Sequence, residues 1–428
     1  MERIDGKRAD ARGRATSAVV LLVLLLLLLL ASVSICGCTD AREIESVGFI
    51  LGLGIDIADG GRVRIWVQTA VPSSKPEEAE RQPAWTTSSE GESVWDAMRK
   101  LNSRSAKALF RGHIRVLVFS EKYARGGIAR ALDVLARDGD FRYKSWVVVT
   151  SDPIERLFAV QAEHETVASL HVNDIMLSAT RSSTAPLSRF MDLITSLEQP
   201  GDQPLLARVS LVKSEPASGE SEAGQGANAG QDGASGQECV EISGSAAFHD
   251  DKMVGWLDPE QTAAVLMMRN RLRDYSFTHR MPGREGGTVG VSLSGVRAAI
   301  EFPAQASTDP DALRGAEVRI RVRGRVDIRE VNSGQQAMNR QSLDELASRL
   351  SRQIEENLAQ LIHTAQHVLG SDIIGIGETV RRRVPSRVWD REVSPTWHDT
   401  FKTLKIVPDV SVEVVKRGMT TSSPVPER

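Results

Sequence analysis

The sequence predicts an α+β fold in several domains, with mixed or antiparallel sheets flanked by helices. Two patterns carry this prediction. Residues 318–328 alternate apolar and charged side chains, which is typical of a strand with one buried and one solvated face. Residues 342–369 repeat apolar side chains at spacings of three and four, which is typical of a helix with one buried face. Helical and strand patterns occur in both halves of the chain, so each half is expected to combine sheets with helices.

In the N-terminal half, strands and helices are expected to follow one another. Residues 48–56 are apolar and predict a buried strand. Residues 58–61, Ala-Asp-Gly-Gly, predict a turn because glycine tolerates a positive φ. The remaining elements expected in this half are strands at 62–68, 113–119 and 145–150 and helices at 93–105, 121–137 and 154–162.

The C-terminal half holds the clearest patterns. The strand at 318–328 places arginines on its polar face, and the helix at 342–369 is expected to end at Gly370. A last strand is expected at 405–415. The arginine-rich face is either a solvated surface or a surface that meets anionic lipid headgroups or an acidic partner.

A low-complexity segment, Ser214–Glu238, divides the body of the chain. It is rich in Gly, Ala, Ser and Glu and has no large apolar residue. Such a segment cannot bury enough surface to offset its ordering entropy, so it is expected to be a flexible linker or insertion. The predicted domains are therefore 38–213, with room for two subdomains, and 239–428.

The first 37 residues have the pattern of a secretory signal. Arg12 and Arg14 precede a long apolar run, and Ile35, Gly37 and Cys38 fit the cleavage box of a bacterial lipoprotein. We therefore expect lipid on Cys38, which would tether the mature chain to a membrane from outside the cytoplasm. The alternative is an uncleaved transmembrane helix, since the run is close to the lower limit of about 18 apolar residues. Cys36 is the weaker acceptor because bulky Ile35 precedes it.

Composition bounds the class of protein. The 428 residues are 25 % charged and 41 % hydrophobic, which is ordinary for a folded protein. Loss of residues 1–37 leaves a net charge of −5, which argues against a nucleic-acid partner. Only Cys239 then remains as a free thiol, so no disulfide within the mature chain is expected.

Motifs for catalysis or for binding a cofactor or metal are incomplete. The Gly52–Gly54 and Gly375–Gly377 pairs lack the third glycine of a dinucleotide loop, and tight turns or close packing explain them better. His363 and His367 lie four residues apart on the expected helix, but Thr364 stands where a zinc protease has Glu. No catalytic, cofactor or metal-binding residue is therefore assigned, and an enzyme is not expected.

Two further groups keep structural and functional readings open. Asp133, Asp138 and Asp140 could form a pair of catalytic carboxylates, but nothing in the sequence fixes their geometry. Asp138-Gly139-Asp140 predicts a turn. Three tryptophans are expected either in the core or at an interface, because large aromatic side chains are enriched in both: Trp256, Trp389 and Trp397.

Many short blocks, in one order over residues 37–418, resemble the Ger(x)C family, the lipoprotein C subunit of spore germinant receptors. Thr39 departs from the family, which usually has Trp there, and the insertion at 214–238 is the main further departure. The matching blocks are Gly37–Glu45, Gly48–Asp56, Glu92–Ala97, Arg111–Ile114, Arg137-Asp138 with Arg142, Gly244–Phe248, Lys252–Leu257, Ser371–Glu378, Trp389, Trp397, Phe401 and Val414–Gly418.

The resemblance implies a scaffold or interaction subunit, held by lipid on Cys38 at the spore inner membrane. Such a subunit acts with two integral membrane subunits, A and B, in a complex that responds to nutrients and triggers germination. The family fold is three α/β-type domains. The rival hypothesis is a lipid-anchored solute-binding protein that captures the nutrient itself. Alternating strands argue against this rival, because parallel sheets have continuous apolar strands.

Overall fold

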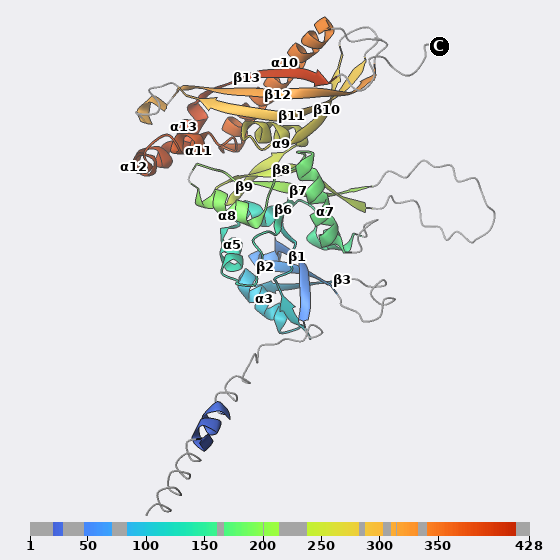
Figure 1. The fold of residues 1–428 in the computed structure, drawn as a ribbon, viewed down its shortest axis with the longest axis vertical. Coiled ribbons are helices and arrows are strands. Elements are labelled where there is room, and N and C mark those ends of the chain that lie inside the picture. The colour runs from blue at the N-terminus through green and yellow to red at the C-terminus, as the bar shows by residue number, and fades with distance from the viewer. Residues whose placement is uncertain are drawn as a thin grey trace, which may run out of the picture. The chain divides into compact units, whose positions relative to one another are not determined.

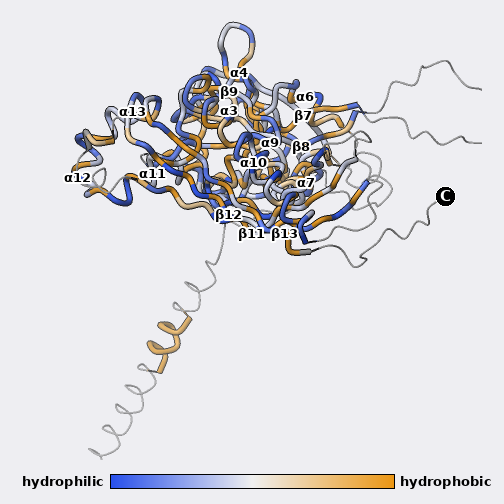
Figure 2. Tube along the Cα trace, turned by 90° about the horizontal axis from the view of Figure 1, so that it is seen from above, coloured by the Kyte–Doolittle hydropathy of each residue, from blue (hydrophilic) through white to orange (hydrophobic). Residues whose placement is uncertain are grey.

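The computed structural model describes residues 20–28, 47–70, 84–160, 167–199, 201–213, 238–281, 287–302, 310–313, 315–332 and 340–416. The chain divides into two compact units, Met1–Val47 and Gly48–Arg428. In the first unit, residues 20–28 form a hydrophobic helix with exposed side chains (Figure 2). Within the ranges given above, no helix is both long and apolar enough to cross a membrane.

The second unit confirms the predicted α+β fold, with two sheets flanked by helices (Figure 1). The larger, sheet A, has the strand order β3-β2-β1-β5-β6-β7-β8-β9, and β4 pairs with β1. Its strands are β1 (Val47–Ile57), β2 (Val63–Ala70), β3 (Ala84–Gly91), β4 (Ala108–Phe110), β5 (Val116–Ser120), β6 (Trp146–Thr150), β7 (Leu205–Lys213), β8 (Glu238–His249) and β9 (Lys252–Leu257).

The centre of sheet A is parallel. Strands β1, β5, β6 and β7 run in the same direction, and every residue of β5 and β6 is buried. Burial on both faces is typical of parallel strands and explains their continuous apolar sequences. The expectation that the strands alternate throughout is therefore wrong for this part, and alternation gives no argument against a solute-binding fold here.

The strands on either side of residues 214–237 pair with each other. In this antiparallel pair Lys213 of β7 lies opposite Glu238 of β8. The low-complexity segment thus joins adjacent strands of sheet A, and sheet A contains strands from both sides of it. The segment itself lies outside the described residues apart from Glu238, and the division into domains there stays a prediction.

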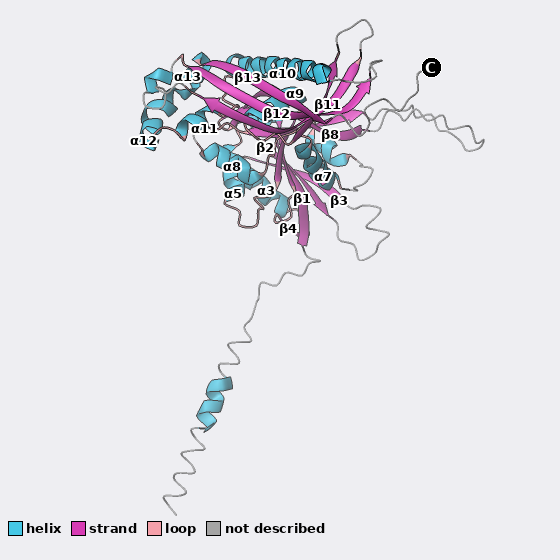
Figure 3. Cartoon of the chain, turned by 45° about the horizontal axis from the view of Figure 1, so that its top comes forward, coloured by secondary structure: helices cyan, strands magenta, loops and turns pink. Residues whose placement is uncertain are grey.

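Sheet B is smaller and has one helix-covered face. In the order β10-β11-β12-β13 only the last pair is parallel. Buried residues of β12, including Val318, Ile320 and Val322, form one hydrophobic core with Leu350 and Leu358 of α10. Figure 3 shows α10 lying along this sheet. The strands are β10 (Asp274–Arg280), β11 (Thr288–Glu301), β12 (Glu317–Asn332) and β13 (Lys405–Lys416).

The helices cover sheet A on both faces and one face of sheet B, where three hydrophobic cores form. Their bounds are α3 (Val94–Asn102), α4 (Glu121–Gly126), α5 (Ala129–Ala136), α6 (Ile154–Ala159), α7 (Ala168–Arg181), α8 (Phe190–Glu198), α9 (Pro259–Met268), α10 (Arg340–His363), α11 (Ile376–Arg381), α12 (Ser386–Val388) and α13 (Trp397–Thr403). Short 3-10 helices span Asp59–Gly61, Pro310–Leu313 and Ser394–Thr396, and π-helical turns span Thr364–Leu369 and Trp389–Val393.

Most expected elements are present, with two differences. The helix expected at 121–137 is broken into α4 and α5 at Gly127, whose φ is 111°. The break persists because the next two backbone N–H groups donate to Asp251 instead of continuing the helix. The strand expected at 113–119 begins only at Val116, since the Ile114 N–H donates back to the Arg111 carbonyl in a turn.

Candidate functional site

The lipid-attachment residue Cys38 and its neighbour Cys36 lie outside the described residues, so lipidation stays a prediction. Cys239 lies on β8 and is a half-buried thiol without a disulfide partner among the described residues. The most elaborate polar site in the described part of the chain lies instead between residues 201–203 and the region that follows α10. We call it the polar junction and define it by Asp202, Gln203, Arg269, Asp372 and Trp397.

Asp372 is the centre of the polar junction. One carboxylate oxygen, Oδ1, accepts from the N–H groups of Gly375 at 3.0 Å and Ile376 at 3.1 Å. The other, Oδ2, accepts from the Gly377 N–H at 2.6 Å and from Trp397 Nε1 at 3.1 Å. A carboxylate offers about four acceptor sites. All are thus occupied by the protein, which leaves Asp372 no free site for a substrate.

Arg269, at the end of α9, links the two sides of the junction. Its Nη2 lies 3.0 Å from Asp202 Oδ1 and donates to the Gln203 carbonyl at 2.8 Å. Its Nε donates to the Ile373 carbonyl at 2.6 Å. The guanidinium is almost fully buried, so removing either partner would leave an uncompensated charge.

Two glycines let the backbones meet at the junction. A Cβ on Gly377 would lie 2.5 Å from Trp397 Nε1 and 3.0 Å from the Gly201 carbonyl oxygen. Gly201 has a φ of 92°, and a Cβ there would lie 2.8 Å from the Gly377 carbonyl carbon. Close packing is thus confirmed for Gly377, and likewise for Gly54, where a Cβ would lie 2.5 Å from Ile154.

Burial controls the charge of Asp372. Burial raises the pKa of its carboxyl to about 6, although the Gly377, Ile376 and Trp397 N–H groups and the Arg269 charge favour the ionised form. Glu378, six residues on, is different. Burial opposes its charge, but ion pairs with Arg381 and Arg382 at 2.6 and 2.8 Å lower its pKa overall.

The structure separates the remaining sequence candidates. Trp389 and Trp397 are buried with ring centroids 5.9 Å apart, so the core alternative is confirmed for both. Trp256 is half-buried, with the Arg208 guanidinium 4.8 Å above its ring. Asp138 is not part of a carboxylate pair but forms an ion pair with Arg111.

Two pairs of histidine rings lie close together. His363 and His367 have ring centroids 4.7 Å apart on the surface of the helix. In the part of the chain that the structure describes, no group of three or more His, Cys, Asp or Glu side chains could hold a metal ion. A second pair, His249 and His398 at 4.6 Å, joins residues far apart in sequence that spacing could not reveal.

The arginine-rich face of β12 is exposed on the side of sheet B away from α10. Arg319 and Arg321 pair with Glu317, Glu301 and Asp409. Arg323 lies directly opposite Arg297 of β11, and among the described residues neither has an ion-pair partner. Part of this face is thus neutralised and part carries free positive charge.

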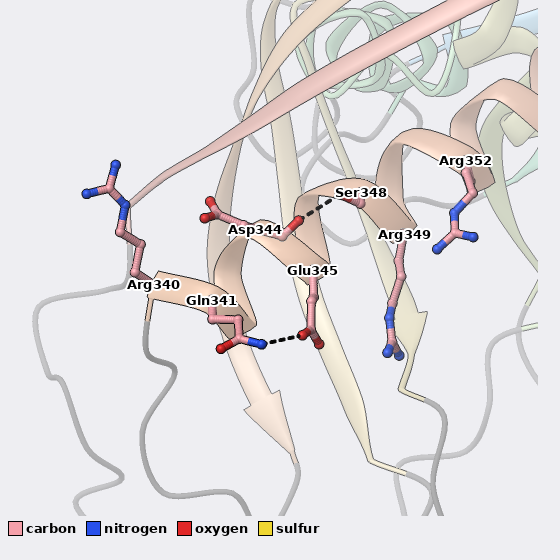
Figure 4. A pocket seen from close by; sticks show the side chains of 7 residues that line it. All are labelled: Arg340, Gln341, Asp344, Glu345, Ser348, Arg349 and Arg352. Carbon is pink, nitrogen blue, oxygen red and sulfur yellow. Dashed lines mark hydrogen bonds between the residues drawn. The ribbon is translucent and has the colours of Figure 1, made fainter.

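The hollows among the described residues include one along α10 and one beside β10. A shallow one of about 610 Å³ lies along the start of α10 and is lined by charged side chains, including Arg340, Asp344 and Arg352 (Figure 4). A small one of about 70 Å³ lies between α9, β10 and α10 beside Tyr275 and Phe277. Ligand pockets usually measure about 300–1,000 Å³ and are mostly apolar, and neither hollow meets both conditions.

Comparison with known proteins shows two family matches. The family model described as the spore germination protein N-terminal domain matches residues 40–211. The model described as spore germination B3/GerAC like, C-terminal, matches residues 243–418. The two matched regions follow one another along the chain. Asp202 and Gln203 of the polar junction lie in the first region, and the other three residues of the junction lie in the second.

Relatives from Bacillus subtilis (strain 168) match almost end to end. The putative spore germination protein YfkR is 22 % identical, over 89 % of this chain and 93 % of its own. Spore germination protein KC is 21 % identical over 84 % and 88 %, and spore germination protein B3 is 18 % identical over 90 % and 95 %. Among solved structures, that of the GerBC protein matches with a TM-score of 0.48 and 14 % identity, covering 88 % of this chain and 100 % of that one.

Proposed function

Because the chain belongs to the GerAC-like family of spore germination proteins, we propose that it is a lipid-anchored, non-enzymatic subunit of a germinant receptor. The observation that carries the proposal is the match of both family domains, in order, over residues 40–211 and 243–418. The alignment with spore germination proteins covers most of both chains. This coverage supports a shared function of the whole chain and not of one domain alone.

Anchoring is proposed through lipid on Cys38. The apolar run, Gly37 and the thiol provide the sequence needed for cleavage and acylation. Two or more acyl chains on one residue would hold the protein stably, whereas a single chain gives only marginal binding. The compact unit would then lie on the extracytoplasmic face of the spore inner membrane.

A scaffold role is proposed because the most elaborate buried polar site in the described residues serves structure. Asp372 has its acceptor sites filled by protein donors, and Arg269 is engaged on both sides of the junction. Such a site fixes the relative position of segments without offering a reacting group. The proposed partners are the integral membrane A and B subunits of the receptor.

The experiment replaces Cys38 by Ala and, as a matched control, Cys36 by Ala in the chain expressed in its own spores. Membrane fractionation and the germination response to nutrients are then measured. We expect the Cys38 variant to leave the membrane and to weaken or abolish germination, and the Cys36 variant to behave as the unmodified chain. A Cys38→Ala protein that stays fully membrane-bound and functional contradicts the anchor.

A nutrient-binding role is the competing function. It requires specific calorimetric binding of an amino acid or sugar by the protein itself. Such binding, together with unchanged membrane partners, would move the chain to the solute-binding class.

A further inference from the structure

One edge of sheet A is formed by the first residues of its parallel strands. Strands β1, β5 and β6 are parallel and adjacent, and Gly52, Val116 and Trp146 are paired along one edge. β1 begins at Val47 and extends five residues beyond this line. The antiparallel partners of β1 bring the start of β3 to this edge as well. We call it the amino edge. In Figure 3, β1 and β4 reach the end of sheet A that lies away from α10.

Basic side chains gather at the amino edge. Arg115 directly precedes β5, and Arg142 and Lys144 lie four and two residues before β6. All three are exposed, and among the described residues none has an ion-pair partner. Arg115 and Arg142 lie close enough to His113 for their charges to lower its pKa, after the larger effect of burial.

The acidic side chains closest to these loops are already engaged. Asp138 forms an ion pair with Arg111, and Asp140 lies 3.9 Å from the same guanidinium. Asp192 accepts the Arg189 N–H at the start of α8. At the opposite edge, Asp56 is the second-last residue of β1, and Asp59 and Asp152 follow β1 and β6. The charge of the central strands is therefore polarised towards the amino edge.

Exposed apolar side chains lie among the basic ones. Trp85 at the start of β3 is 46 % exposed, Tyr143 is 43 % exposed and Met191 is 55 % exposed. The Met191 N–H donates to the Tyr143 carbonyl at 3.0 Å, so these two side chains start from adjacent backbone. Aromatic and apolar side chains between basic ones are typical of surfaces that rest on a lipid interface.

Chain connectivity restricts where this edge can face. β1 begins at Val47, nine residues after Cys38, and an extended chain spans about 3.3–3.6 Å per residue. A lipid on Cys38 would therefore hold Val47 within roughly 30 Å of the bilayer. Arg115, whose N–H donates to the Leu51 carbonyl, lies beside a point four residues further along β1. This step rests on the proposed anchor, whereas the charge and exposure of the edge do not.

We propose that the amino edge binds the surface of an anionic bilayer, with Arg115, Arg142 and Lys144 contacting lipid headgroups. Basic residues attract anionic headgroups only within about a Debye length, which is roughly 8–10 Å at physiological salt. A tether that leads into β1 raises the concentration of these residues near the bilayer. Arg297, Arg323 and Arg325 of sheet B also lack ion-pair partners in the described part of the chain, but the segment after Cys38 does not lead into sheet B.

The test uses the compact unit from Gly48 to Arg428, which contains all three hydrophobic cores and lacks Cys38. Its sedimentation with vesicles of phosphatidylcholine, with and without phosphatidylglycerol, is measured at several salt concentrations. We expect binding only to the anionic vesicles, and we expect it to weaken as salt rises.

The variant replaces Arg115, Arg142 and Lys144 by Gln, and the matched control replaces Arg297, Arg323 and Arg325 by Gln. Since each basic residue near an anionic surface strengthens binding about fivefold, the edge variant is expected to lose roughly 100-fold and the control less than about fivefold.

Equal binding to neutral vesicles overturns the proposal, as does an equal loss in both variants, which would reflect net charge alone. A third outcome also contradicts the proposal. The compact unit does not bind either kind of vesicle, and the full chain with the three edge substitutions no longer co-purifies with membrane subunits. The edge would then contact protein and not lipid. The vesicle results do not depend on Cys38, so failure there is distinguishable from failure of the lipid anchor.

Discussion

Replacing Asp372 by Asn should remove a pH dependence of stability that the buried carboxyl creates. Its pKa rises from the ordinary value of 3.8 to about 6 in the folded protein. Between these values the folded state holds a proton that the unfolded state has released. The stabilisation from the protonated carboxyl is thus fully present below about pH 4 and lost as the pH rises through about 6. At about 1.4 kcal/mol per pKa unit, the loss is about 3 kcal/mol.

The assay is urea unfolding of the wild-type and Asp372→Asn proteins from pH 4 to pH 7, followed by tryptophan fluorescence because Trp389 and Trp397 lie at or beside the junction. Burial lowers the pKa of His113 and His398, whose contributions are lost as pH falls, but both proteins share them. The difference between the two free energies of unfolding therefore isolates Asp372. It should fall by about 3 kcal/mol as the pH rises over this range.

Parallel curves for the two proteins would refute the reasoning. They would mean that the four N–H donors and Arg269 keep the carboxylate ionised in spite of burial. Glu378→Gln is the matched control. The pKa of Glu378 is lowered in the folded protein. Its contribution to the free energy of unfolding is therefore fully present at pH values above its unfolded-state pKa, and it is lost only as the pH falls below that pKa.

Three further changes test packing at and near the junction. Gly377→Ala should destabilise by more than about 2 kcal/mol in urea unfolding, because its Cβ would meet the Trp397 indole, while Gly139→Ala, with open space around it, should be nearly neutral. Arg269→Met should cost about 3–5 kcal/mol by stranding Asp202 in a buried site, and a loss below about 1 kcal/mol would contradict the buried ion pair. Leu358→Ala, at a fully buried position of α10, should lower the free energy of unfolding by about 2–5 kcal/mol, as measured by calorimetry.

The sequence predicted those elements whose apolar periodicity is long. The α10 helix and β12 each repeat their pattern over many residues, and both lie where expected. β11 carries a shorter signal, Val289, Val291 and Leu293, which a register shift after Ser294 interrupts. Short patterns of this kind do not separate a strand from a loop without its pairing partners.

Burial on both faces is harder to read from sequence. β5 and β6 are only five residues long, and a short apolar run fits a buried helix segment as well as a parallel strand. Alternation in the other strands is therefore no evidence against a parallel sheet at this point. The break at Gly127 has a similar origin, because the groups that receive the next N–H donors belong to Asp251, far along the chain.

The polar junction shows the same limit. Asp372 lies in a block that the family resemblance singled out, together with Gly375 and Gly377. Asp202 and Arg269 gave no sequence signal, because they are 67 positions apart and only the fold brings them within 3.0 Å. Buried ion pairs of this kind become visible only when the chain is folded.

The most direct test of the receptor-subunit account is co-purification. The tagged chain is expressed in spores, the inner membrane is extracted in mild detergent, and the retained proteins are identified. We expect two integral membrane subunits, present with the unmodified chain and with Cys36→Ala, and lost with Cys38→Ala. Recovery of no membrane subunit, with a nutrient retained on the protein instead, would contradict the account and favour a solute-binding protein.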